Sequence, residues 1–216
     1  MKKTLIAFTL IAMQTFFGFA MAQELSQSTQ AVFDACSQMR AAIGSGSTAT
    51  LRTANTALKE CKVRDFSSFN PVDENTLSLD GHFVFDYEFV DSLIAGREVY
   101  KFAQRYADRT TVRGTTSVPD QVFTKTCAVK GNASVKYTFK SRGHQELAVV
   151  TEPGGLVTLR VHDTTNDVWY NDTKKVKKGQ PTRTLVFDLP TAKRNELEVE
   201  VINLSKEDIS FVVISN

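Results

Sequence analysis

The segment from Asp163 to Asp172 places hard oxygen donors beside the only tryptophan of the chain. Alternating Asp and Asn side chains can supply several of the roughly six to eight oxygens that bind calcium, although the spacing of an EF-hand loop is absent. The aromatic pair could instead stack on a sugar ring. In the third interpretation the tryptophan is core and the Asx residues only form turns. The candidate ligand-binding residues are Asp163, Asn166, Asp167, Trp169, Tyr170 and Asp172.

The other groups that could do acid-base or nucleophilic chemistry are scattered. His82, His144 and His162 lie in three different local contexts, and no serine occupies a GxSxG turn. His82 together with Asp86 and Glu88 is the one set from which an exported hydrolase could assemble a site with distant residues. The residues favour a protein that is not an enzyme. They predict no catalytic residue and no resident metal or cofactor beyond the calcium alternative.

The sequence contains three cysteines, and their spacing matches no zinc motif. Apolar positions recur at helical intervals over residues 26 to 62, with a Gly-Ser break at 44 to 47. This pattern predicts a helical hairpin with Cys36 on one apolar stripe and Cys61 on the other. A Cys36–Cys61 disulfide bond is therefore expected, with Cys127 left as a buried thiol.

Residues 1 to 22 have the three parts of a cleavable secretory signal in order: Lys2 and Lys3, an apolar run, and the small-residue site Ala20-Met21-Ala22. The run is shorter than the ~20 residues that span a bilayer, and no later segment is apolar enough to do so. The mature chain is expected to begin at Gln23 and to be periplasmic or extracellular.

The net charge of the chain limits the kinds of partner that it could bind. Without Lys2 and Lys3, 24 of the 26 Lys and Arg residues remain against 24 Asp and Glu, so the mature chain is formally neutral. A nucleic-acid binder needs a basic surface to displace phosphate counterions, so no nucleic-acid partner is expected. A lysine run over 174 to 178 is the one local charge excess, and it is typical of a blunted sheet edge.

Alternation with a period of two residues dominates the second half of the chain and predicts β-strands. Phe139, Leu159 and Phe211 lie on the apolar side of three such strands, which must face the core. Turn residues separate the strands at short intervals. The expected fold is mainly β, an antiparallel jelly-roll-like sandwich preceded by the helical hairpin. The predicted parts are a signal peptide (1–22), a helical hairpin with linker (23–75) and a β-rich domain (76–216), clearest over 132–216.

The stretch from Lys136 to Asn216 contains YTF, ELAVV, EPGG, LVTLRV, LEVEVIN and SFVVISN in strand order. In this pattern it resembles the β-sandwiches of the bacterial pre-peptidase C-terminal type. The resemblance implies an exported accessory or binding module and carries over no catalytic residue. The expected function is therefore a non-catalytic module that binds a glycan or a protein at the cell envelope, with the exported hydrolase as the alternative.

Overall fold

The structure is a computed structural model that describes residues 24–72, 75–99, 121–171 and 179–216. Two antiparallel helices open it, α1 (Gln27–Ser45) and α2 (Thr48–Glu60). The side chain of Ser26 accepts a hydrogen bond from Thr29 N–H and caps α1, and Ser47 caps α2 in the same way. Gly46 ends α1 with φ of 69°, a conformation that costs glycine little. The predicted helical hairpin is confirmed.

Two five-stranded sheets follow, and all strand pairs are antiparallel except β1 with β3. In spatial order, sheet A contains β1 (Arg64–Asp65), β3 (Phe123–Val129), β10 (Ile209–Ser215), β5 (His144–Thr151) and β8 (Thr182–Asp188). Sheet B contains β2 (Asn70–Pro71), β4 (Ser134–Ser141), β9 (Asn195–Asn203), β6 (Val157–Asp163) and β7 (Val168–Asn171). From β3 to β10 the strands run 3-10-5-8 in one sheet and 4-9-6-7 in the other, the order of a jelly roll. The mainly β fold class predicted from the sequence is confirmed.

The two sheets enclose the larger of two apolar clusters. The expected core positions Phe139, Leu159 and Phe211 are 6%, 1% and 0% exposed and all belong to it. Polar side chains alternate with them along β4, β6 and β9, because successive strand residues point to opposite faces. The registers assigned from the period-2 pattern are therefore correct for these strands.

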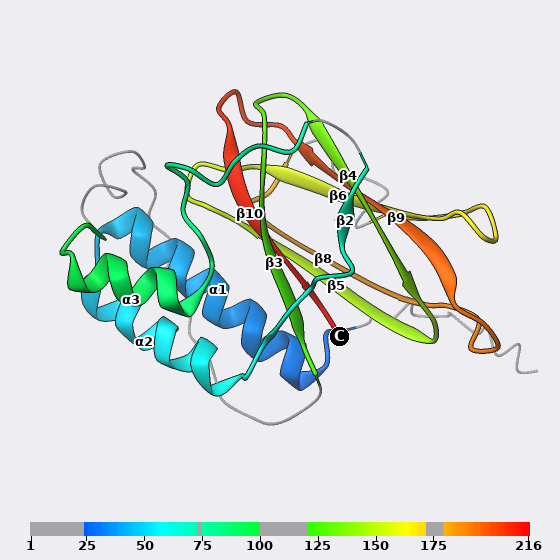
Figure 1. The fold of residues 1–216 in the computed structure, drawn as a ribbon, viewed down its shortest axis with the longest axis horizontal. Coiled ribbons are helices and arrows are strands. Elements are labelled where there is room, and N and C mark those ends of the chain that lie inside the picture. The colour runs from blue at the N-terminus through cyan, green and yellow to red at the C-terminus, as the bar shows by residue number, and fades with distance from the viewer. Residues whose placement is uncertain (1–23, 73–74, 100–120, 172–178) are drawn as a thin grey trace, which may run out of the picture.

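Helices cover the other side of sheet A (Figure 1). Ala148, Val150, Val212 and Ile214 of β5 and β10 join the apolar residues of α1, α2 and α3 (Tyr87–Ala95) in a second cluster. Sheet A thus has an apolar layer on each side, and every residue of β10 is buried. The described residues therefore form three layers: the helices pack against one side of sheet A, and sheet B packs against the other.

No helix of the described residues packs against sheet B. In Figure 1 the described helices all lie on the side of sheet A. The outward side chains of β4, β9, β6 and β7 form the opposite surface of the molecule, on which Trp169 is exposed and Glu200 is buried beside Arg160. We call this surface the outer face of sheet B. It is formed by Lys136, Arg160, His162, Trp169, Glu198 and Glu200.

The three cysteines are free thiols, so the Cys36–Cys61 disulfide bond expected from the sequence is not formed in the structure. Cys36 is fully buried within α1, whereas Cys61 is half-buried and lies beyond the last residue of α2. Cys36 lies nine residues before the end of α1, whereas Cys61 comes thirteen residues after the start of α2, so the two cysteines lie at different distances along the chain from the turn between the helices. Cys127 is buried on β3, as expected.

Alkylation of the folded protein by iodoacetamide is expected to modify Cys61 first. Burial raises the pKa of all three thiols, to about 11 for Cys127 and further for Cys36, and only Cys61 is partly exposed. The reactive species is the thiolate, so Cys36 and Cys127 should react only after unfolding. Peptide mass spectrometry with and without denaturant measures this order. If Cys36 and Cys61 both resist alkylation until a reductant is added, the protein carries the disulfide bond instead.

In the described part of the chain, no helix is both long and apolar enough to cross a bilayer. The expected signal peptide at 1–22 lies outside the described residues, as do Asp172 and the lysine run.

Candidate functional site

The candidate site is the part of the outer face of sheet B that surrounds Trp169. Trp169 lies on β7, the edge strand, and its Cα is paired with that of His162 on β6. This strand is only four residues long, and the ring of Trp169 is 46% exposed. Residues that follow one another on a strand point to opposite sides, so Tyr170 points inward instead.

The indole ring of Trp169 contacts two side chains of the neighbouring strand β6. The His162 ring stacks on it with centroids 4.3 Å apart and planes 3° from parallel, and the Arg160 guanidinium lies 5.1 Å from the ring centroid. A cation over an aromatic face contributes about 0.5 to 1 kcal/mol at an exposed site. These contacts restrict the rotamers of Trp169 before any ligand arrives, which lowers the entropic cost of binding.

Both supporting side chains are themselves held by carboxylates. Arg160 forms an ion pair with Glu200 on the neighbouring strand β9, and His162 Nε2 lies 2.9 Å from Asp167 Oδ1. Beside them Lys136 Nζ is 2.9 Å from Glu198 Oε1, which raises the pKa of that lysine. The exposed tryptophan is therefore surrounded by ion pairs that hold its neighbouring side chains in place.

Tyr170 belongs to the core rather than to this surface. Its ring stacks on Phe187 of β8 with centroids 4.3 Å apart. Burial, followed by the charges of Asp163 and Asp188, raises the pKa of its hydroxyl. Of the predicted aromatic pair, only Trp169 is placed to touch a ligand on the outer face of sheet B.

Asp163 is a structural residue of the β6–β7 turn. One carboxyl oxygen accepts from the Thr165 and Asn166 N–H groups at 3.0 and 3.2 Å, and the other from the Asn166 and Asn195 amides at 2.7 and 2.6 Å. Burial acts to raise the pKa of Asp163, but these four hydrogen bonds outweigh it and the net pKa is lowered. A carboxylate has about four acceptor positions, so none is left for a calcium ion.

The remaining predicted oxygen donors are not brought together. The Asn166 side chain is engaged with Asp163, whereas Asp167 is turned outward to His162. Across the described ranges no group of three or more His, Cys, Asp and Glu side chains converges as a metal site would require. The turn-forming role of the Asx residues accounts for their positions.

The residues of the hydrolase alternative have separate local roles. His82 Nδ1 lies 2.9 Å from Glu152 Oε1, while Asp86 caps α3 by accepting from the N–H groups of Glu88 and Phe89 at 2.8 and 3.1 Å. None of the contacts in the described part of the chain joins His82 to Asp86 or Glu88. Among the described residues, His82, Asp86 and Glu88 thus do not form a common site.

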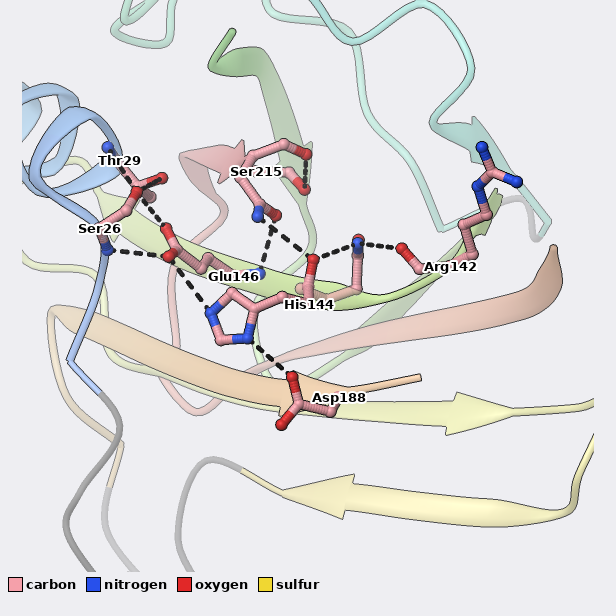
Figure 2. A network of polar contacts seen from close by, with 9 residues as sticks. Ser26, Thr29, Arg142, His144, Glu146, Asp188 and Ser215 are labelled. Carbon is pink, nitrogen blue, oxygen red and sulfur yellow. Dashed lines mark hydrogen bonds and ion pairs between the residues drawn. The ribbon is translucent and has the colours of Figure 1, made fainter. Parts of the chain in front are cut away.

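A second polar network contains a serine, a histidine and two carboxylates, the residue types of a catalytic triad (Figure 2). They are not connected in the order that a triad requires. His144 Nδ1 is 2.8 Å from Asp188 Oδ1, and its Nε2 is 3.5 Å from Glu146 Oε1. The Ser26 hydroxyl donates to Glu146 at 2.8 Å rather than to the imidazole. A serine nucleophile needs a base within about 2.6 to 3.2 Å, usually a histidine. Here the buried carboxyl of Glu146 instead anchors the start of α1 to sheet A.

The sequence analysis did not identify Arg160 or His162 as partners of Trp169. The available signal was the short turn between Asp163 and Val168, which makes a hairpin and sets His162 opposite Trp169.

Comparisons with known proteins add little beyond the fold. No protein-family model matches the chain, and no curated protein sequence matches it. The Yersinia pseudotuberculosis-derived mitogen is similar over 46% of this chain and 86% of its own, with 13% identity and a TM-score of 0.36. A pre-peptidase C-terminal domain of Bacillus anthracis collagenase covers 47% of this chain and all of its own, with 14% identity and a TM-score of 0.34. A Salmonella Typhimurium periplasmic inhibitor of g-type lysozyme covers 49% and 95%, with 14% identity and a TM-score of 0.30. These likenesses are coarse, and the fold assignment depends on the strand order alone.

Proposed function

We propose that this chain is an exported, non-catalytic β-sandwich module that binds carbohydrate at the cell envelope through the outer face of sheet B. The observation that carries the proposal is Trp169, a large aromatic ring 46% exposed on a sheet face that no described helix covers. Aromatic rings of this kind present apolar area with a polar edge, which suits the faces of sugar rings. The export part of the proposal depends on residues 1 to 22.

The support of Trp169 by the sheet favours binding over a packing role. A tryptophan whose purpose is stability is normally buried, and this one leaves nearly half of its surface in water. Its neighbours His162 and Arg160 hold it without covering it fully. Rigid presentation of an exposed ring is what a binding platform requires.

The Trp169→Ala variant is expected to lose carbohydrate binding while unfolding at nearly the same temperature as the parent. An exposed ring that contacts two side chains contributes about 1 kcal/mol to the free energy of folding, so its removal should change stability little. The same substitution removes the aromatic surface on which a sugar ring would stack. Val168→Ala is the matched control, because Val168 precedes it on the same strand and is 41% exposed. A glycan array identifies the ligand, and calorimetric titration compares the three proteins.

Two results would count against this function. One is unchanged glycan affinity in the Trp169→Ala variant. The other is a fall of several kcal/mol in its free energy of unfolding, since that would make the ring a core element rather than a platform.

A further inference from the structure

Four exposed cations gather at one end of the sandwich, at the end of β4, in the β4–β5 turn and in the β8–β9 loop. We call Lys140, Arg142, Lys193 and Arg194 the basic loop cluster. None of these side chains takes part in an ion pair with another described residue. In Figure 2 the Arg142 guanidinium extends away from the His144 network, and no dashed line reaches it. As far as the described residues go, these four cations are therefore available to a ligand.

Strand register, not sequence proximity, brings the cluster together. Lys140 is paired with Glu196, and Ser141 with Asn195, at the ends of β4 and β9. Arg142 and Arg194 each lie one residue beyond the Ser141–Asn195 pair. A hydrogen bond of 2.8 Å from Leu189 N–H to the Gly143 carbonyl then joins the two loops. Residues about fifty positions apart in the chain thus share one surface.

Nearby acidic groups do not cancel this charge. Between residues 140 and 144 and between 188 and 196, the exposed acids are Asp188 and Glu196, against the four cations. Asp188 is already hydrogen bonded to His144 at 2.8 Å. Glu146 is buried, and its oxygens accept from the Ser26 N–H and hydroxyl at 2.8 Å. The local excess of positive charge is two, on a mature chain that is formally neutral.

The basic loop cluster adjoins the platform of Trp169. The β6–β7 turn is tied to the start of β9, since Asn195 donates to Asp163 at 2.6 Å and the Glu196 N–H donates to Thr165 at 2.9 Å. One strand pair farther along β6 and β7, His162 is paired with Trp169. A chain of sugars lying across the outer face of sheet B, from β7 over β6 and β9 to the end of β4, would pass both the ring and the cations.

We propose that the ligand of this face is an acidic glycan whose anionic groups bind the basic loop cluster while a sugar ring stacks on Trp169; this rests on the carbohydrate-binding function proposed above. The two arginines present planar forks that match carboxylate and sulfate oxygens, and the two lysines add point charges. Neutral glycans would engage the ring alone and bind more weakly.

Two pairs of polymers test the charge requirement in calorimetric titrations with the purified protein. Polygalacturonate is compared with its methyl ester, and dextran sulfate with dextran, so that each pair differs in the anionic group. At least one acidic polymer is expected to bind about tenfold tighter than its neutral partner, with an advantage that shrinks as salt screens the charges. The two pairs distinguish carboxylate from sulfate recognition.

Paired variants locate the charge. Lys193→Gln/Arg194→Gln removes two cations from the cluster, and Lys130→Gln/Lys206→Gln removes two exposed cations from turns at the opposite end of the sandwich. The first is expected to weaken binding of the acidic polymer about tenfold and the second less than about twofold. Thermal melts of both variants check that the fold is retained.

The outcomes separate this inference from the proposed function. Equal binding of acidic and neutral polymers, equal losses in the two double variants, or no binding of either acidic polymer overturns the acidic-glycan inference. Binding of any of these polymers that survives Trp169→Ala unchanged overturns the platform itself, whatever the charge dependence.

Discussion

Replacement of Phe211 by alanine is expected to lower the free energy of unfolding by about 3 to 5 kcal/mol, the range for a buried phenylalanine. Phe211 is fully buried at the centre of the cluster between the sheets. It lies on β10, with Cys127 and Thr151 as its paired positions on the two flanking strands, so little can move in to fill the cavity. Urea denaturation measures the loss, with the m-value checking that the unfolding remains two-state.

Leu204→Ala is the control for this measurement. Leu204 is a large apolar residue that is 41% exposed in the turn before β10, and surface substitutions of this kind stay within about 0.5 kcal/mol. A Phe211→Ala variant as stable as Leu204→Ala would mean that β10 does not face the sandwich core as described.

The Glu152→Ala variant is expected to lose about 3 to 5 kcal/mol, the cost of removing one partner from a buried charged network. Glu152 is fully buried after β5, and its carboxyl group accepts from Ser210 N–H at 2.9 Å and Phe83 N–H at 3.3 Å. Its Oε1 is also 2.9 Å from His82 Nδ1. Alanine would leave these groups buried without an acceptor.

Two further variants show whether the carboxyl group is the cause. Glu152→Gln keeps one oxygen acceptor and a similar volume, so its loss should be clearly smaller than that of alanine. Glu207→Ala removes an exposed glutamate and should change the free energy of unfolding by less than about 0.5 kcal/mol. Equal urea midpoints for Glu152→Ala and Glu207→Ala would show that the carboxyl group does not hold residues 82 and 83 to the sheet.

These contacts also explain where sequence reasoning failed. The alternation of Leu77, Leu79, Phe83 and Phe85 indicates a strand, but residues 77 to 86 form no named strand in the structure. Side-chain acceptors hold the backbone of this segment instead. The Glu152 carboxyl group accepts from Phe83 N–H, and the Thr126 hydroxyl accepts from Phe85 N–H at 3.1 Å. A carboxyl group about seventy residues away along the chain is invisible to any local pattern.

Periodicity alone determined the sandwich. Alternating side chains on the β4, β6 and β9 segments need one apolar and one solvated face, so Phe139 and Leu159 had to point inward. The same rule separates Trp169 from Tyr170, because neighbours on a strand diverge. Helical periodicity and the Gly-Ser break likewise determined α1 and α2. These are local consequences of backbone geometry and therefore readable from the chain.

Only the tertiary structure decided what covers each face and which distant residues meet. The continuous burial along β5 and β10 is explained once helices are seen to pack on sheet A, whereas no described helix packs on sheet B. Cross-strand register sets His162 under Trp169 and joins the turn carrying Arg142 to the loop carrying Arg194. Such contacts depend on strand order and register over the whole chain. The local sequence specifies the elements, and their pairing creates the surface that could bind a ligand.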